Sequence, residues 1–282
     1  MASDKNIPSS VDISGEKIHW DQEMNYADYL SLDKILGAQK PLSGEHDEVL
    51  FIIIHQATEL WLKLCLHELD QAIEQIKRDD LGPAFKMLSR IARIQAQLLQ
   101  SWEVLSTLTP VDYTKFRDHL GQSSGFQSYQ YRLLEFRIGN KNGTLVDVHK
   151  SRPEIFERLQ TALNQPSLYD EVLRLLARRG FDLPEHCLER DWSLPHETNA
   201  QVEKVWLTIY KEAQEHWDIY ELAEKLVDLE YHFQQWRFGH LKTVERIIGM
   251  KRGTGGSSGV PYLSRALEIK FFPELWSVRT LL

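Results

Sequence analysis

Apolar residues recur with helical spacing along nearly the whole chain. The segment VLFIIIHQATELWLKL, in a helix predicted over 46–77, is apolar almost all round, so we expect this helix to lie in the core. The same spacing predicts further helices over 26–36, from Gly82-Pro83 to about 108, over 110–120 and from Phe126 to Gly139. A very long helical pattern without proline covers 197–249, and a last helix precedes the closing FFPELW.

Cap signals mark two of these helix starts. Ser43 can cap the helix over 46–77, with three acidic residues close behind it at the positive end of the helix dipole. Thr109-Pro110-Val111-Asp112 combines a cap, a first-turn proline and an acidic third position. The helix over 110–120 is therefore expected to begin at this proline.

The pattern predicts one all-α domain over 1–282, a helical bundle with long core helices. Residues 1–20 read as a flexible polar arm. The stretch 140–195 is less regular, with a linker, two short helices that flank Pro166 and a mostly loop segment. We interpret it as a small helical insert, because the apolar pattern resumes directly after it.

Composition narrows the classes of partner and compartment. The formal net charge of −8 disfavours binding to nucleic acid or to anionic lipid. Cys65 and Cys187 are the only cysteines, too few for a disulfide framework or a cysteine zinc site, which favours a reducing compartment. The longest wholly apolar run, 49–54, is far shorter than the roughly 20 residues of a membrane helix, and the N-terminus has no export signal. We expect a soluble, cytoplasmic protein.

Several familiar active-site patterns are absent from the sequence. There is no His-Glu-x-x-His pair, no Gly-x-Ser-x-Gly elbow and no phosphate-loop signature. The only Glu-x-x-His match, Glu16 to His19, lies in the polar arm and cannot build a di-iron centre between core helices. The glycine-rich segment 253–259 follows a helix instead of a strand, which excludes a dinucleotide-binding fingerprint.

Polar residues on otherwise apolar helices remain as candidates. His55 lies four residues after Phe51, on the same face of the helix over 46–77. A buried neutral imidazole must satisfy its ring nitrogens or border a cavity. A plain core histidine, bonded to another side chain, is the more common case for this residue taken alone.

A second pair lies one turn apart on the helix over 110–120. Tyr113 and Arg117, with Leu120 on the same stripe, would make a good carboxylate clamp, because arginine binds carboxylates through two parallel hydrogen bonds. The alternative is a surface ion pair between Arg117 and Asp118 or Glu135. Spacing alone favours that alternative.

His240 lies on a stripe with Phe233, Trp236, Val244 and Ile247. A neutral histidine on a helix in an apolar pocket is what a b-type haem needs as its proximal ligand, although such a stripe is more often plain core. The loop that follows, 251–259, is a candidate lid with Thr254 supplying a hydroxyl, or else a simple connector.

Taken together, the stretches FIIIHQATELWLKL, FRDHLGQSSGFQSYQYR, WRFGHLKTVERIIGMKRGTGGSSGV and FFPELW resemble the tryptophan 2,3-dioxygenase family over roughly residues 20–280. The resemblance implies a helical homotetramer, a dimer of dimers, with one haem b in a pocket between the helices of each subunit. It implies that ferrous haem, O₂ and L-tryptophan give N-formylkynurenine by insertion of both oxygen atoms across the indole C2–C3 bond, the first step of the kynurenine pathway.

The resemblance also implies roles for single residues. His240 matches the proximal ligand of the haem iron, and His55 matches the distal histidine that hydrogen-bonds the indole N–H. Arg117, supported by Tyr113, matches the partner of the substrate carboxylate, and Thr254 matches a hydroxyl that contacts the substrate's ammonium and carboxylate groups. We assign His55 a positioning role, because an indole N–H need not be deprotonated for attack.

Other matches concern the walls of the site. Phe51 and Leu120 would flank the indole ring. The haem surround would include Trp102, Ser124 and Gly125. An N-terminal segment that completes the site of the neighbouring subunit would include Tyr26, Tyr29 and Leu30.

Two rival functions remain open at this point. One is a helical haem protein that binds or senses a ligand without turnover. The other is a cofactor-free helical interaction protein, which leaves His55, His240 and the glycine-rich loop unexplained. A Soret band separates the second rival from the haem proteins, and turnover of tryptophan separates the first from the enzyme.

Overall fold

The computed structural model describes residues 14–17 and 24–282, and in this part of the chain all regular secondary structure is helical. The all-α prediction is therefore confirmed. The chain divides into two units, residues 1–40 and 41–282. The longer helices are α3 (His46–Lys77), α4 (Leu81–Leu105), α6 (Tyr129–Ile138), α7 (Pro153–Leu163), α8 (Leu168–Arg178), α10 (Ala200–Lys211), α11 (Trp217–Ile248) and α13 (Pro273–Leu281); the shorter ones are α1 (Tyr26–Leu30), α2 (Leu32–Leu36), α5 (Pro110–Arg117), α9 (Glu185–Leu188), α12 (Val260–Ala266) and the 3₁₀ turns η1 (Asp118–Leu120), η2 (Gly125–Gln127), η3 (Gly143–Leu145) and η4 (Asp147–His149).

The first unit contains two short helices where the sequence predicts one. Asn25 caps α1 by accepting the N–H of Asp28, and α1 ends at Ser31. Ser31 has a positive φ of 50°, a left-handed conformation that a continuous α-helix does not allow. The single helix predicted over 26–36 is therefore wrong. Neither α1 nor α2 has a buried residue.

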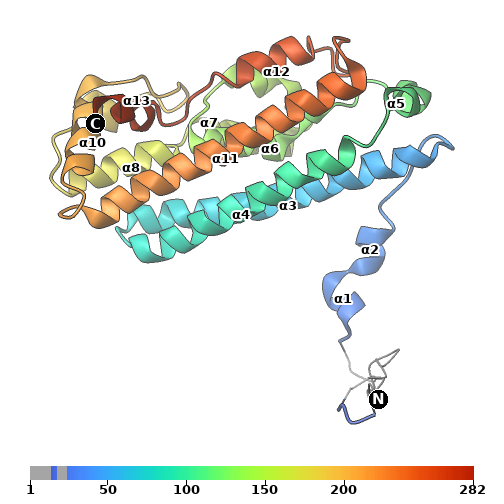
Figure 1. The fold of residues 1–282 in the computed structure, drawn as a ribbon, viewed down its shortest axis with the longest axis horizontal. Coiled ribbons are helices and arrows are strands. Elements are labelled where there is room, and N and C mark those ends of the chain that lie inside the picture. Colours follow the sequence, from blue (N-terminus) through green and yellow to red (C-terminus); the bar gives the residue numbers. More distant parts are fainter. Residues whose placement is uncertain (1–13, 18–23) are drawn as a thin grey trace, which may run out of the picture. The chain divides into compact units, whose positions relative to one another are not determined.

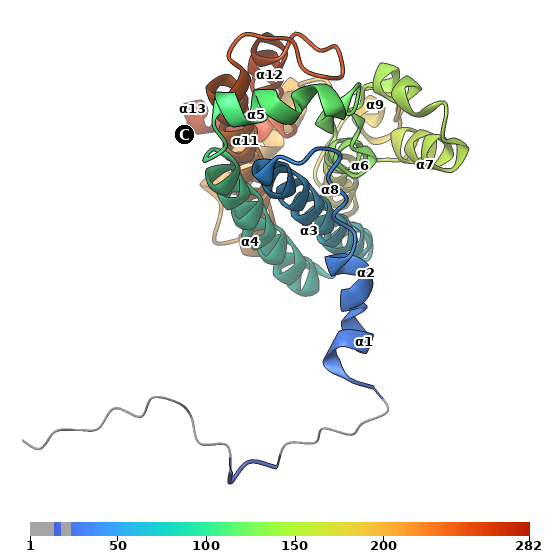
Figure 2. The ribbon, with the colours of Figure 1, turned by 90° about the vertical axis from the view of Figure 1, so that its right-hand side faces the viewer.

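In the second unit, three long helices run side by side (Figures 1 and 2). Helix α4 packs against both α3 and α11, and their facing side chains form the core. Leu69 and Ile76 of α3 and Ile91 of α4 are almost wholly buried. Burial of one such side chain stabilises the fold by roughly 1.5–3 kcal/mol. These three helices form the frame that carries the site.

The start of α3 differs from the predicted cap. Glu45, and not Ser43, occupies the N-cap position, and its side chain makes no capping bond. Instead, the buried carboxylate of Glu48 reaches back from the first turn and accepts the N–H groups of Leu42 and Ser43, each at 2.7 Å. These hydrogen bonds hold the pKa of Glu48 below its usual value although burial acts to raise it. The cap predicted at Thr109 is confirmed, since its side chain accepts an N–H in the first turn of α5.

The very long pattern predicted over 197–249 forms two helices. A turn at residues 212–216 separates α10 from α11. Helix α10 packs against α13 at one end of the unit, whereas α11 runs along α4 (Figure 1). Arg279 of α13 donates to Glu224 of α11 at 2.7 Å and lies over the ring of Tyr210 of α10, so the three helices are joined beside this turn.

Helices α7 and α8 flank Pro166 as predicted. Helix α8 begins with a capping box between Ser167 and Asp170 and packs against α3. Its wholly buried apolar side chains are those of Leu168, Tyr169, Val172, Leu173, Leu175 and Leu176. This part of the less regular stretch therefore contributes to the main core.

By length and composition alone, α3 could cross a membrane, with a mean hydropathy of 1.6 in its most apolar window. The wholly apolar run considered in the sequence analysis understates this, because isolated polar residues interrupt a longer apolar stretch. Only 17% of that window is buried, so the prediction that the apolar first half of α3 lies in the core is wrong. A single helix of this kind is weak evidence for a membrane. Helix α3 packs against α4, α6 and α8.

Candidate active site

The predicted site residues of the second unit gather at one end of the long helices. They come from the N-terminal part of α3, the C-terminal parts of α4 and α11, helix α5 and the loops 121–125 and 251–259. Figure 1 shows α5 and the ends of α4 and α11 together at this end, opposite α10 and α13. Residues more than 180 positions apart in the sequence thus reach one region.

The tautomer of His55 follows from its hydrogen bond. Its Nδ1 lies 2.7 Å from the backbone oxygen of Phe51, which can only accept, so Nδ1 carries the proton and donates. Burial lowers the pKa of His55, against the opposing effect of this bond, and the ring is neutral at pH 7. Its Nε2 is therefore left with a free lone pair, ready to accept a hydrogen bond. The core partner of His55 is a backbone group and not another side chain.

A cluster of aromatic rings lies beside this histidine. The ring of Phe51 lies 4.2 Å from that of His55, and the rings of Tyr113 and Phe116 lie 6.0 and 5.7 Å from Phe51. Burial raises the pKa of Tyr113 despite the nearby Arg117, so its hydroxyl stays protonated at neutral pH. Leu120, in η1, packs partly buried against the same core. Phe51 and Tyr113 therefore lie together beside His55.

His240 lies close enough to His55 for the two to interact electrostatically. Burial, with a smaller effect from His55, lowers the pKa of His240 to about 4, so its ring is also neutral at pH 7. The indole of Trp102 stacks on this ring at 4.7 Å and 12°, and Trp236 lies 6.2 Å away on the same helix. Among the described residues, neither ring nitrogen of His240 has a hydrogen-bond partner, and part of the side chain remains accessible.

Gly239 makes this stacking possible, and the sequence analysis missed it. A Cβ atom at this position would lie 3.0 Å from side-chain atoms of both Leu99 and Trp102, closer than packed side chains normally approach. Trp102 comes near enough to donate its Nε1–H to the backbone oxygen of Trp236 at 3.1 Å. A lone glycine inside a 32-residue helix was the available signal, because glycine costs about 1 kcal/mol there unless packing requires it.

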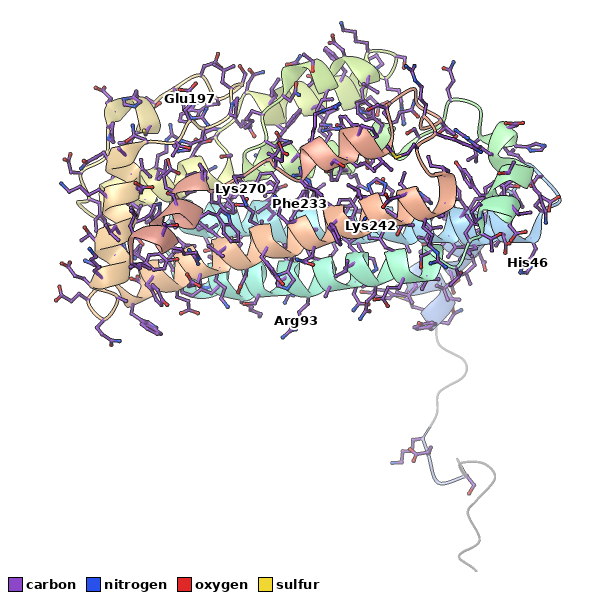
Figure 3. All side chains as sticks on the ribbon, turned by 45° about the horizontal axis from the view of Figure 1, so that its top comes forward. His46, Arg93, Glu197, Phe233, Lys242 and Lys270 are labelled. Atoms are coloured by element: carbon purple, nitrogen blue, oxygen red, sulfur yellow. The ribbon has the colours of Figure 1, made fainter. Side chains whose placement is uncertain are left out.

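Trp236 contributes an unsatisfied donor at the same place. Its Nε1 is wholly buried and has no hydrogen-bond partner among the described residues. A buried donor without a partner costs about 1–3 kcal/mol, so such groups usually serve a ligand or a function. Figure 3 labels Phe233 and Lys242, which bracket this stretch of α11. The signal for Trp236 was its place on the His240 stripe.

The predicted substrate-binding groups are held by backbone oxygens of two loops. Arg117 donates to the oxygen of Arg252 at 2.7 Å, and the hydroxyl of Thr254 donates to the oxygen of Ser123. The surface ion pair considered for Arg117 does not occur among the described residues, since Glu135 pairs elsewhere. Both bonds tie the loop 251–259 to the region of α5 and the loop 121–125.

Close backbone contact supports the same docking. A Cβ at Gly255 would lie 2.7 Å from that of Ser124, so only glycine allows this approach. Ser124 caps the turn η2, and Gly125 is exposed with open space where a side chain would be. In the first unit, Tyr26 and Tyr29, which are predicted to complete a neighbour's site, are each 75% exposed.

Comparison with known proteins decides the family. The family model for tryptophan 2,3-dioxygenase matches residues 12–163 and 159–282. The tryptophan 2,3-dioxygenase of Erythrobacter litoralis (strain HTCC2594) is 61% identical over 259 residues, covering 92% of this chain and 98% of the relative. Those of Cupriavidus necator (strain H16) and Bacillus thuringiensis (strain Al Hakam) are each 56% identical, covering 94% and 93% of this chain and 90% and 95% of the relatives. This chain belongs to the tryptophan 2,3-dioxygenase family.

Membership of this family identifies the reaction that the chain catalyses. The chain is an oxidoreductase that uses O₂ to cleave the indole ring of L-tryptophan to N-formylkynurenine, and its family depends on haem. The residues present fit that cofactor. A haem offers an iron to the neutral imidazole of His240 and a flat ring to its aromatic neighbours.

Proposed function

We propose that His240 holds the haem iron in this dioxygenase. The observation that carries the proposal is a neutral, partly accessible imidazole without a hydrogen-bond partner, fixed by a stacked indole on a rigid helix. A protonated ring would have no lone pair for the metal, so its low pKa keeps it competent. Haem bound there, ferrous in the active state, supplies the site at which O₂ binds and is activated.

Trp102, Ser124 and Gly125 complete the haem surround in this proposal. Trp102 fixes the face of the His240 ring through stacking and through its bond to the Trp236 oxygen. Ser124 and Gly125 form a small turn beside the docked loop, with open space next to Gly125. No proton transfer is required from these residues.

His55 positions the substrate. With its Nδ1 proton committed to Phe51, its Nε2 accepts the indole N–H and sets the orientation of the ring. Phe51 and Leu120 flank the indole through apolar contact. The same tautomer argues against His55 as a proton donor, because the nitrogen that faces the substrate carries no proton.

Arg117 and Thr254 recognise the amino-acid end of the substrate, with support from Tyr113. Both now bind neutral backbone oxygens, and the substrate carboxylate would replace these with charge-assisted bonds that are roughly twice as strong. The exchange links substrate binding to the position of the loop 251–259. The substrate, contacted by Arg117 and Thr254 together, would then take over from these two bonds in holding the loop over the site, which excludes water from it.

The assembly proposed is a homotetramer, a dimer of dimers, in which the N-terminal segment completes a neighbour's site. Two observations support an interface with a second copy. Tyr26, Tyr29 and Leu30 project from α1, whose residues are all exposed. An apolar stripe on α3 is also exposed, comprising Ile53, Leu60 and Leu64. The two units would then act as one catalytic domain per subunit.

The compartment proposed is the cytoplasm, with no nucleic-acid or membrane partner. Both cysteines are free and buried, as suits a reducing compartment. The acidic net charge of −8 disfavours polyanionic partners.

One experiment tests the site proposal directly. Haem-loaded protein is reduced without oxygen, mixed with L-tryptophan and then given O₂ while the near-ultraviolet absorbance of N-formylkynurenine is recorded. We expect one O₂ consumed per tryptophan in the parent, and no turnover when His240 is replaced. A His240→Ala protein that keeps the parent's haem spectrum and turnover would overturn the assignment of the iron ligand.

A further inference from the structure

Helices α6 and α11 are joined by a buried cluster of charges. Arg132 and Glu135 of α6 and Arg237 of α11 are only 3%, 3% and 4% exposed. Glu135 accepts from Arg132 through one oxygen and from Arg237 through the other, the latter at 2.6 Å. We call these three residues the charge triad. It carries two positive charges and one negative charge.

Further polar contacts satisfy most of the remaining groups. Arg237 donates to the backbone oxygen of Ala266, at the end of α12, at 2.8 Å and to the hydroxyl of Tyr131 at 3.3 Å. Asn140 donates to Glu135 at 3.0 Å. Helices α6, α11 and α12 are thereby joined around one buried guanidinium, and Glu135 is its only acidic partner among the described residues.

The triad lies one helical turn from the proposed haem ligand. Arg237 precedes His240 by three residues, about 4.5 Å along the helix axis. Tyr131, which contacts Arg237, also packs against Trp236 at 5.3 Å, and Trp236 faces His240. A continuous set of contacts therefore connects the triad to the His240 ring.

Other charged groups near the triad do not cancel its excess charge. Glu230, the next buried acid on α11, lies two turns earlier and accepts the N–H groups of Phe271 and Phe272. Burial raises the pKa of Glu230, and the positive charge of Lys270 acts against this effect. His149 also faces Arg132, and burial together with this arginine lowers its pKa, so it is neutral at pH 7.

Stability alone is a poor explanation for such a cluster. Buried ion pairs and triads can often be replaced by apolar residues of similar volume with no loss of stability. An excess charge in a weakly polarisable interior, however, acts over a longer distance than one at the surface.

We propose that the charge triad tunes the reduction potential of the iron held by His240, favouring the ferrous state through its excess positive charge. This inference rests on the proposed role of His240. Ferrous iron carries one positive charge fewer than ferric iron, so a buried cation stabilises it relative to the ferric form. For a unit charge on the order of 10 Å away at an effective dielectric constant of about 20, the ferrous-to-ferric ratio changes by roughly tenfold.

Substitutions that change the triad's charge by opposite signs provide the test. Glu135→Gln raises the charge by one, and Arg237→Met lowers it by one. Arg237→Lys and the double variant Glu135→Gln/Arg237→Met leave it unchanged. Arg246→Met is the matched control, because Arg246 is an exposed arginine of the same helix that bonds to Ser106. Reduction potentials are measured by spectroelectrochemical titration of the Soret band in haem-loaded protein.

We expect the potential to follow charge and not the number of lost contacts. The potential should rise in Glu135→Gln and fall in Arg237→Met, and the fall should correspond to a roughly tenfold lower ferrous-to-ferric ratio. It should stay near the parent value in Arg237→Lys, in the double variant and in Arg246→Met. Shifts of the same sign in both single variants, or a double variant displaced beyond either, would show a purely structural role and overturn the proposal. If Glu135→Gln does not fold, the proposal is still tested by Arg237→Met, which changes the charge, against Arg237→Lys and the double variant, which do not.

The outcomes also separate this inference from the proposed function. Unchanged potentials in a protein that binds haem and oxidises tryptophan would reject the triad's role alone. A parent protein that binds no haem at all would instead reject the role of His240.

Discussion

Two partly buried histidines lie at opposite ends of the long helices, and their hydrogen-bond partners differ. His196, near α10 and α13, lies 2.7 Å through Nε2 from the buried carboxylate of Glu274. Tyr169 and the N–H of Asn199 also bind this carboxylate, and Trp206 donates to Tyr169 at 3.0 Å. Each of these contacts is made within the protein.

At the other end, the equivalent groups lack such partners. His240 has aromatic neighbours and no hydrogen bond among the described residues, and Trp236 Nε1 is buried and unpaired. His55 keeps a free Nε2. Burial of the polar groups is similar, so burial does not distinguish a functional histidine from a structural one. The unsatisfied hydrogen-bonding capacity does.

The largest expected effect comes from replacing each of the two histidines in turn and comparing the results. His240→Ala should abolish stable haem binding, because it removes the only proposed ligand of the iron. His196→Gln should retain haem and turnover but lose about 1–3 kcal/mol of unfolding free energy, because it disturbs a buried hydrogen-bonded network. Haem titration and chemical denaturation of both variants provide the comparison. Equal loss of haem in the two would remove the distinction.

Arg117→Met should lower kcat/KM for L-tryptophan by about 10- to 100-fold, the value of a charge-assisted hydrogen bond. The loss should be mainly in KM, since the carboxylate is bound before and during reaction. Steady-state kinetics measures it, with the haem spectrum as a check that the site is intact. Lys115→Met, at an exposed position two residues earlier, is the control and should be near neutral. An unchanged KM in Arg117→Met would contradict the clamp.

His55→Ala should reduce turnover by about tenfold and leave measurable activity, because it removes one positioning hydrogen bond. The pH profile sharpens this expectation. Burial holds the pKa of His55 below its ordinary 6.5, so kcat/KM should stay level as the pH falls through that value and decline only below it, when Nε2 becomes protonated. His55→Ala should lack this decline. Complete inactivity with intact haem and substrate binding would point to an obligatory acid–base role instead.

The smallest expected effect is on stability, in a comparison of alanine substitutions at two helical glycines. Gly239→Ala should cost about 1–3 kcal/mol of unfolding free energy and weaken haem binding, since its methyl group would displace Trp102 or Leu99. Gly82→Ala, in the open first turn of α4, should stabilise by about 0.4–1 kcal/mol. Thermal unfolding and haem titration test both. Equal effects would show that the close approach of Trp102 is not required.

The sequence predicted features that depend on local patterns. The bounds of α3 follow from its apolar run, and the start of α5 from Thr109 and Pro110. The breaks at Ser31 and at residues 212–216 carry no proline or glycine. At the second break the chain leaves α10, which packs against α13, a contact that only the folded chain makes visible.

The site shows the same division. His55, Arg117 and His240 stand out as polar residues on apolar helices, and the family resemblance gives them roles. The tautomer of His55 depends on a bond made after folding. The Glu135–Arg237 pair joins residues 102 positions apart, a separation at which sequence spacing says nothing about contact.

The central claim is that the free imidazole nitrogens of His55 and His240 are reserved for tryptophan and haem. A crystal structure of the anaerobic ferrous haem–L-tryptophan complex tests it most directly. The account predicts an imidazole nitrogen of His240 on the iron, the indole nitrogen about 3 Å from His55 Nε2, and Arg117 on the substrate carboxylate. An iron ligated elsewhere, or a His55 ring turned so that Nδ1 faces the indole, would contradict it.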